Sequence, residues 1–402
     1  MQIMPLNFKK FIDKKGKEKY FCLEISSSFL RGTLLTSSDQ KIEIIDSQFK
    51  TLESPREENI SKVDPEIIKE FINDIKIPSN SEIIILGSSS FIFTVPAWVK
   101  VQRESKEEVE EAELENLISQ AVWKFLNVFR PQAVDVLGIS ETDILLADIR
   151  NLGVKVNGHK VLNPIGFKAK TIEFLIEETF VNRDYFRAIE EIFSQKSKPV
   201  FISELGLVDS QVVFRSFNFE KPFTLTRFFP GSVLALSCEN REKFKEDISE
   251  PIISLVGDIS WDKDIFISRL SEKLGLSYEP SSKIIEAFYA GEVSSKIEKF
   301  IKDLISLEWK DFTKKISKKI SPSKPVFIIE DKKIPEFVLR KKEKPKMEKL
   351  DIQKIFKKLG FEIGDVEESL FSALAGFIEH YFSNHDDRLN KLARRRAKWL
   401  IP

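Results

Sequence analysis

Glu24, three consecutive serines and Arg31 fall within one predicted hairpin whose residue types could bind a phosphate group. A β-rich run, Phe21–Ile25, breaks into Ser26–Ser28 and resumes at Phe29–Leu35. Backbone N–H groups and hydroxyls at such a turn can surround phosphate oxygens. The alternative is a hairpin whose serines only bond within their own turn. The first question is therefore whether a nucleotide binds here.

Familiar enzyme motifs do not occur in the sequence. None of GxxxxGK[ST], GxGxxG, GxSxG or HExxH is present. The three histidines, His159, His380 and His385, are too scattered for a metal or acid–base cluster, and the first two are expected on the surface. Cys22 and Cys238 lie far apart without a CxxC pair, which favours a reducing cytosol. We therefore predict no catalytic residues and no metal ligands.

The composition indicates a highly charged chain of several structural units whose formal net charge is zero. Its 402 residues suffice for about two to four structural units. Hydrophobic residues make up 42% and charged residues 31%, so packed cores are expected. The 63 basic residues balance 63 acidic ones, which argues against nucleic-acid binding. No signal peptide or transmembrane segment is predicted, because Gly87 and Pro96 interrupt the longest uncharged run.

The elements that must position the hairpin begin with a β-meander. Strands are predicted over 20–25, 29–36 and 41–48, followed by a helix over 65–75 and a buried strand within 81–90. An α+β module follows. Ser105 and Glu108 predict a capping box at the start of a long helix, and Asn157-Gly158 predicts a tight hairpin turn. The remaining predicted elements of this module are strands at 135–140, 143–150, 154–164 and 170–181 and a helix at 182–195.

The second half repeats strands and helices less regularly. Strands are predicted at 231–238, 251–260 and 324–331, and helices at 264–274, 282–290 and 294–305. The Lys-, Glu- and Pro-rich segment 340–350 is typical of a solvated linker. Two helices, 365–381 and 387–400, are predicted to end the chain.

Three segments resemble the actin-like FtsA and PilM family of bacterial division and pilus-assembly proteins. "VKVQRESKEEVEEAELENLISQA" at 99–121 and "VKVNGHKVLNPIGFKAKTIEF" at 154–174 resemble the SHS2 (1C) subdomain, and "CLEISSSFLRG" at 22–32 resembles the phosphate-1 loop. The match covers roughly residues 18–210, and the NPIG hairpin is closer to FtsA. The resemblance implies two similar lobes that hold nucleotide phosphates between two β-hairpins, with an acidic residue near magnesium.

The resemblance also implies that the nucleotide site is degenerate. In the phosphate-1 loop Glu24 stands for Asp, Ser26 for Gly, Ser27 and Ser28 for the hydroxyl positions, and Arg31 for Lys. A Cβ at the glycine position costs on the order of 1 kcal/mol where φ is positive, and a longer acid fits a magnesium shell less well. Leu236 and Cys238 are expected at the second loop's Asp and Gly positions, and "VFIIEDKKIPEF" at 326–337 has no adenosine-loop glycine. No cofactor is expected, with weak Mg-ATP binding as the alternative.

The C-terminal helix has features of an interfacial membrane helix. Six basic residues lie between Arg388 and Lys398 with no acidic residue among them, and Trp399 could lie at the headgroup level. FtsA proteins typically end in such a helix. A basic helix packed on its own domain, with Trp399 as a core anchor, is the alternative. The predicted membrane-contact residues are Arg388, Leu389, Leu392, Arg395, Trp399 and Leu400.

These observations predict an α/β protein with an actin-like (ribonuclease H-like) two-lobed fold and an inserted SHS2-type subdomain. The expected divisions are lobe 1 at 1–91, the insert at 92–195, lobe 2 at 196–339, the linker at 340–350 and the C-terminal helices at 351–402. The expected function is that of a cytoplasmic, FtsA-like adaptor at the inner face of the membrane. Its expected partners are a division filament such as FtsZ and further copies of itself through the edge of the insert. A PilM-like pilus component that binds a membrane partner's peptide, and a weak ATPase, are the alternatives.

Overall fold

The computed structural model describes residues 18–38, 40–52, 63–194, 199–229, 232–240, 243–259, 263–318, 320, 324–330, 337, 347–384 and 388–397. The chain divides into two compact units. Unit 1 comprises residues 1–216, 242–250 and 351–402, and unit 2 comprises 217–241 and 251–350. Two of the three sheets lie in unit 1 and one in unit 2.

The first sheet of unit 1 has the order β17-β3-β2-β1-β4-β9. Its strands are β1 (Glu18–Ile25), β2 (Phe29–Ser38), β3 (Lys41–Thr51), β4 (Ser81–Gly87), β9 (Pro199–Glu204) and β17 (Glu362–Ile363). β1, β2 and β3 form an antiparallel meander, and β4 and β9 extend it in parallel from β1. The predicted meander and buried strand are therefore confirmed.

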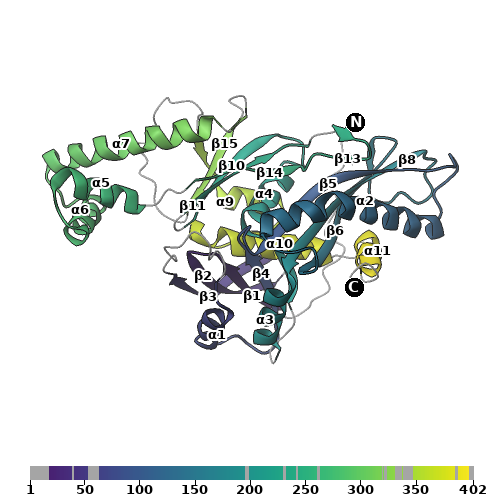
Figure 1. Ribbon diagram of the computed structural model, residues 1–402, viewed down its shortest axis with the longest axis horizontal. Helices are drawn as coiled ribbons and strands as arrows, with labels where there is room; N and C mark the ends of the chain where they lie inside the picture. Colours follow the sequence, from purple (N-terminus) through teal and green to yellow (C-terminus); the bar gives the residue numbers. More distant parts are fainter. Residues whose placement is uncertain are drawn as a thin grey trace. The chain divides into compact units, whose positions relative to one another are not determined.

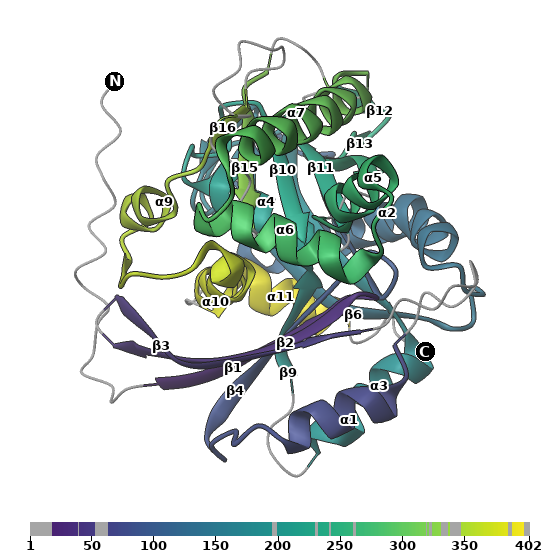
Figure 2. The same cartoon turned by 90° about the vertical axis from the view of Figure 1, so that its left-hand side faces the viewer.

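Helices cover both faces of this sheet (Figure 2). On one face lie α1 (Pro65–Asn73) and α3 (Arg183–Phe193), which contact each other. Asp64 caps α1 by accepting the Glu66 N–H, as expected for an acidic residue before a helix. On the other face α10 (Phe371–Asn384) contacts β1 and β4. Gly376 permits this approach, because a Cβ there would come 3.0 Å from a Leu86 methyl.

The second sheet of unit 1 forms the inserted module, with the order β12-β13-β5-β8-β6-β7. Its strands are β5 (Ile92–Gln102), β6 (Ile144–Val156), β7 (His159–Val161), β8 (Thr171–Asn182), β12 (Phe244–Lys245) and β13 (Ile248–Ser249). The long helix α2 (Glu111–Leu137) lies along this sheet (Figure 1). Asn157 and Gly158 both have positive φ, 49° and 84°, which confirms the predicted tight turn.

Unit 2 contains one sheet of order β14-β11-β10-β15-β16. Its strands are β10 (Phe223–Phe229), β11 (Ser232–Cys238), β14 (Ile253–Ile259), β15 (Val326–Glu330) and β16 (Met347–Lys349). Its helices α5 (Lys263–Leu274), α6 (Tyr278–Ala290) and α7 (Ser295–Ser317) share one hydrophobic core with β10, β11 and β15. Unit 2 therefore repeats the antiparallel meander plus parallel extension of unit 1.

The structure corrects several predicted boundaries. Unit 2 begins at Phe217, because β9 and the unpredicted helix α4 (Leu205–Arg215) complete unit 1. The segment predicted as a linker contains β16, which pairs with β15. Residues 351–402 belong to unit 1, where α9 (Ile352–Lys358), the 3-10 turn Glu368–Leu370, α10 and α11 (Arg388–Ala397) lie.

The start and end of α2 also differ from the prediction. The Ser105 hydroxyl accepts the Glu107 N–H in a local turn, and the helix begins six residues later at Glu111. Arg103 holds that loop, because its guanidinium donates to the carbonyl groups of Glu107 and Glu108. The strand predicted at 135–140 is the end of α2, which Gly138 terminates with a φ of 60°.

Candidate functional site

The serine turn between β1 and β2 is closed by its own hydrogen bonds. The Ser26 N–H donates to the Phe29 carbonyl at 2.9 Å, and the Ser28 N–H reaches the Ser26 hydroxyl oxygen at 3.4 Å. The Ser26 and Ser28 hydroxyl groups lie 3.3 Å apart, while Ser27 is exposed. The carbonyl of Ser28 accepts the Leu52 N–H. This is the geometry of the predicted serine-capped hairpin, with Ser27 exposed and Ser28 half-buried.

Glu24 and Arg31 form a buried ion pair across the same hairpin. They are register partners, their side chains are 0% and 5% exposed, and Arg31 Nη1 lies 3.1 Å from Glu24 Oε2. Arg31 also donates to the Ser369 carbonyl, and its guanidinium lies 5.2 Å from the centre of the Phe49 ring. The predicted magnesium carboxylate is therefore neutralised by the residue in the position of the phosphate-binding lysine.

The residues predicted to form the second phosphate loop lie in a strand. Leu236 and Cys238 lie within β11, where they pair with Leu225 and Phe223 of β10. The turn of this hairpin lies at residues 230–231, outside the described residues. Glu24 lies three residues before the turn at Ser27–Ser28, and Arg227 lies three residues before the turn at residues 230–231 of the unit 2 hairpin. A fully buried arginine thus takes the place of a carboxylate. Half of the predicted adenosine-loop segment, residues 331–336, lies outside the described residues.

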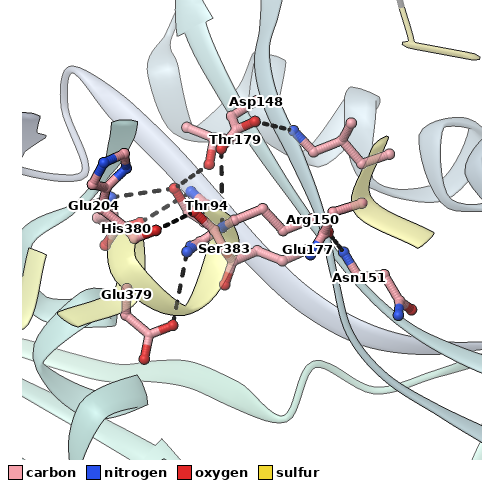
Figure 3. Close-up of polar contacts among 12 residues, drawn as sticks. Thr94, Asp148, Arg150, Asn151, Glu177, Thr179, Glu204, Glu379, His380 and Ser383 are labelled. Atoms are coloured by element: carbon pink, nitrogen blue, oxygen red, sulfur yellow. Dashed lines mark hydrogen bonds and ion pairs between the residues drawn. The ribbon is translucent and has the colours of Figure 1, made fainter. Parts of the chain in front are cut away.

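A second polar cluster, which the sequence did not predict, joins the inserted module to helices α4 and α10 (Figure 3). Arg150 of β6 is 1% exposed and pairs with Glu177 of β8. Its Nη1 also lies 3.7 Å from Glu379 Oε2 of α10. Glu379 in turn accepts two hydrogen bonds from Arg215 of α4, at 2.9 and 2.7 Å. Within this cluster charges of both signs are paired, as buried charges require.

Three buried carboxyl groups of this region have raised pKa values. Burial raises the pKa of Glu177 to about 7, although the Arg150 charge lowers it. Burial raises the pKa of Glu204 to about 8, although the Thr94 N–H donates to its carboxylate. Glu178 has neither oxygen hydrogen-bonded among the described residues, and burial raises its pKa well above the usual range. Burial therefore favours the protonated form of Glu178 and of Glu204.

His380 is a buried residue rather than the predicted surface residue. It is 2% exposed, its Nε2 lies 2.9 Å from Glu82 Oε2, and its ring contacts Tyr20 edge-on. The misprediction arose because α10 is buried along most of its length, which its sequence pattern does not distinguish from a half-exposed helix. His159 is exposed as predicted, and His385 lies outside the described residues.

The C-terminal helix α11 packs on the inserted module. Leu389 and Leu392, predicted to contact lipid, are 4% and 8% exposed and belong to the core beneath α2. Arg388 and Arg395 pair with Glu111 and Glu115 of α2. These four predicted membrane contacts are thus protein contacts, because the apolar face of α11 covers the α2–β6 core. Trp399 and Leu400 lie outside the described residues.

A cleft of about 280 Å³ lies beside α2 in the inserted module. Residues from α2, the start of β6 and β8 line it: Trp123, Leu126, Asn127, Arg130, Pro131, Glu141, Ile144, Leu145, Leu146 and Phe180. Trp123 is 51% exposed, which is unusual for so large an apolar side chain. An exposed aromatic residue at the edge of an apolar cleft is typical of protein-binding surfaces.

The described residues contain no metal-ligand cluster of three or more His, Cys, Asp or Glu side chains. Within the same part of the chain, no helix combines the length and apolar composition needed to cross a membrane. The predicted edge of the insert is short: β7 has three residues, and the Asn151 N–H of β6 donates to Asn390 of α11. Helix α11 therefore covers part of the edge that could pair with another strand.

Strand order identifies the fold. Each unit has a five-strand core of order 3-2-1-4-5 with one antiparallel meander, and unit 1 carries an inserted α+β module. This is the actin-like, ribonuclease H-like architecture predicted from the sequence. Comparison with protein-family models and with curated proteins finds no match.

Solved structures of similar architecture were found at low sequence identity. The "PilM-PilN type IV pilus biogenesis complex" matches with 10% identity and a TM-score of 0.44, covering 94% of this chain and 98% of the other. The ethanolamine utilization protein EutJ from Carboxydothermus hydrogenoformans matches with 9% identity and a TM-score of 0.39, covering 92% and 93%. Gluconate kinase from Lactobacillus acidophilus matches with 8% identity and a TM-score of 0.42, covering 96% and 95%. The strand order of its two units gives the chain an actin-like fold.

Proposed function

We propose that this protein is a cytoplasmic actin-like adaptor that works through protein contacts and does not turn over ATP. The observation that carries the proposal is the buried pair of Glu24 and Arg31 in the hairpin where a phosphate would have to bind. A magnesium ion that bridges phosphates keeps part of its water shell and needs an accessible carboxylate. Glu24 is fully buried and already holds an arginine, so the residues do not fit Mg-ATP.

Freeing Glu24 for magnesium would be costly. Breaking a buried pair leaves a charge without compensation, which typically costs about 3–5 kcal/mol. Arg31 would also lose its hydrogen bond to the Ser369 carbonyl. In unit 2 the place that corresponds to Glu24 is taken by Arg227, a cation that can neither bind a metal ion nor accept a hydrogen bond.

Titration with fluorescently labelled ATP and magnesium tests this proposal. We expect no saturable binding up to about 1 mM, a concentration at which a site supplying roughly 4 kcal/mol would be half filled. Micromolar binding that disappears in Ser27→Glu would overturn the proposal, because Ser27 is the exposed residue of the turn. That result would favour the weak ATPase instead.

An FtsA-like role in cell division is the first candidate within this class, with a filament protein such as FtsZ as the partner. The cleft beside Trp123 specifically favours the second candidate, a PilM-like component that binds a short apolar peptide of a membrane protein. Immobilised FtsZ-tail and pilus-protein N-terminal peptides distinguish the two. Retention by the pilus peptide alone, lost in Trp123→Ala, would favour the second role; retention by the FtsZ tail alone would favour the first.

Peripheral contact with the inner face of the membrane is the remaining part of the proposal. With Leu389 and Leu392 buried, apolar insertion by this end of the chain would come from Trp399, Leu400 and Ile401, beyond Ala397. Each basic residue near an anionic surface adds about 1 kcal/mol. Pelleting with anionic vesicles should therefore fall when Trp399 and Leu400 are both changed to Asp. Equal pelleting of the double variant would show that the segment is not the anchor.

A further inference from the structure

Helix α11 lies in a seam between α2 and β6 that continues beyond the helix as the Trp123 cleft. Along β6, Asn390 bonds to Asn151 and Arg394 to Asp148, so α11 runs toward the start of the strand. Leu146 and Ile144, which line the cleft, are the next residues in that direction. The order of these contacts gives the chain after α11 a direction toward the cleft.

The contacts on α2 indicate the same direction. Arg388 pairs with Glu111 and Arg395 with Glu115, so α11 and α2 progress together along the seam. Leu126 of the cleft follows Glu115 by eleven residues, which is about three helical turns and about 16 Å. It therefore lies on nearly the same face of α2 as the ion pair, further along the helix.

Five residues follow Ala397 in this sequence, and their length and chemistry suit the cleft. Fully extended, five residues span roughly 16–18 Å, which covers the distance along α2 from Glu115 to Leu126. Trp399, Leu400 and Ile401 are apolar, as are most of the residues that line the cleft. Docking would remove these apolar side chains from water, which favours the docked state.

We propose that residues 398–402 of the same chain dock in the cleft formed by α2 and the start of β6. The segment then covers Trp123 and closes the surface available to an external peptide, so that the cleft is self-occupied until a partner displaces it. The docking itself does not depend on the adaptor function proposed above. In the docked state Trp399 lies in the cleft, whereas in the membrane-bound state proposed above it lies in lipid.

Disulfide trapping in the full-length chain tests the docking. Asn127 lines the cleft and is exposed, so Asn127→Cys combined with Leu400→Cys should give an intramolecular crosslink under mild oxidation. The matched control is Val128→Cys with Leu400→Cys: Val128 is also exposed but does not line the cleft. The native Cys22 and Cys238 are buried. Intact mass under denaturing conditions identifies the crosslinked monomer.

The expected result is a crosslinked monomer for the Asn127 pair and little for the Val128 pair. Equal yields, or no crosslink in either pair, would overturn the proposal. A crosslinked dimer would overturn it too, because the occupant would then be a second copy. As a second measurement, alkylation of the single variant Asn127→Cys should become about tenfold faster when Trp399, Leu400 and Ile401 are changed to Ala, as expected for a cleft occupied about nine-tenths of the time. An unchanged rate would contradict docking.

Discussion

Glu204 illustrates how burial controls chemistry at the level of single residues. It ends β9 at the start of α4, where its own N–H donates to the Thr94 hydroxyl at 3.2 Å. Burial raises its pKa from 4.5 to about 8, so the folded protein holds a proton that the unfolded chain releases above pH 4.5. Such a group favours folding at low pH and loses this contribution as the pH rises toward its folded pKa.

Replacing Glu204 with Gln should therefore flatten the dependence of stability on pH. Between pH 4.5 and about 8 the folded state binds one more proton at this site, so wild-type stability falls with rising pH. The site contributes about 1.4 kcal/mol per pH unit to that slope. Urea denaturation at several pH values measures it, with Glu191→Gln on the exposed face of α3 as the control. An unchanged slope in Glu204→Gln would mean that Glu204 is ionised when folded.

Which residues of the site were predictable depends on their separation in the sequence. The Glu24–Arg31 pair follows from the hairpin itself, because a turn centred on residues 27–28 places positions 24 and 31 opposite each other. The Arg150 cluster could not be found this way, since Glu177 and Glu379 reach it from β8 and from a helix more than 200 residues away. No local periodicity relates such positions.

At the level of elements, the apolar pattern predicted most strands and helices but not what α11 contacts. Leu389 and Leu392 share a face in any helix, and the same face suits lipid or a protein core. In the structure this face packs on a protein core, and three arginines of α11 form ion pairs with acidic residues of α2 and β6. Strand β10 was missed because it carries Arg227, a charge normally found at the surface but here fully buried.

Truncating Leu392 to Ala tests whether α11 is an integral part of unit 1. Loss of a buried leucine side chain should lower the free energy of unfolding by about 2–4 kcal/mol. The comparison is Gln132→Ala, an exposed residue of α2, for which a change within about 0.5 kcal/mol is expected. Urea unfolding of both variants measures the difference. Equal effects would mean that α11 is not packed on the α2–β6 core in solution.

The two units of the molecule have the same strand order, but their first hairpins carry different side chains. Residues 18–51 were recognisable as a meander because the strands are adjacent and apolar. The division between units was not recognisable, because unit 1 is assembled from three separate stretches of chain. Only pairing of distant strands and helices, such as β17 with β3 and α10 with β1, brings residues 351–402 back to unit 1. Such long-range assembly leaves no local signal.

The docked segment predicts a link between the cleft and membrane binding. Trp399 and Leu400 would have to leave the cleft to reach lipid. Trp123→Glu should weaken docking and therefore raise the fraction of protein that pellets with anionic vesicles several-fold. The reason is that a docking free energy of about 1.4 kcal/mol changes the undocked population tenfold. Val128→Glu adds the same charge to α2 outside the cleft and should leave pelleting unchanged. Equal pelleting of both variants would mean that occupation of the cleft does not affect lipid binding. A decrease confined to Trp123→Glu would mean that Trp123 itself contacts the membrane.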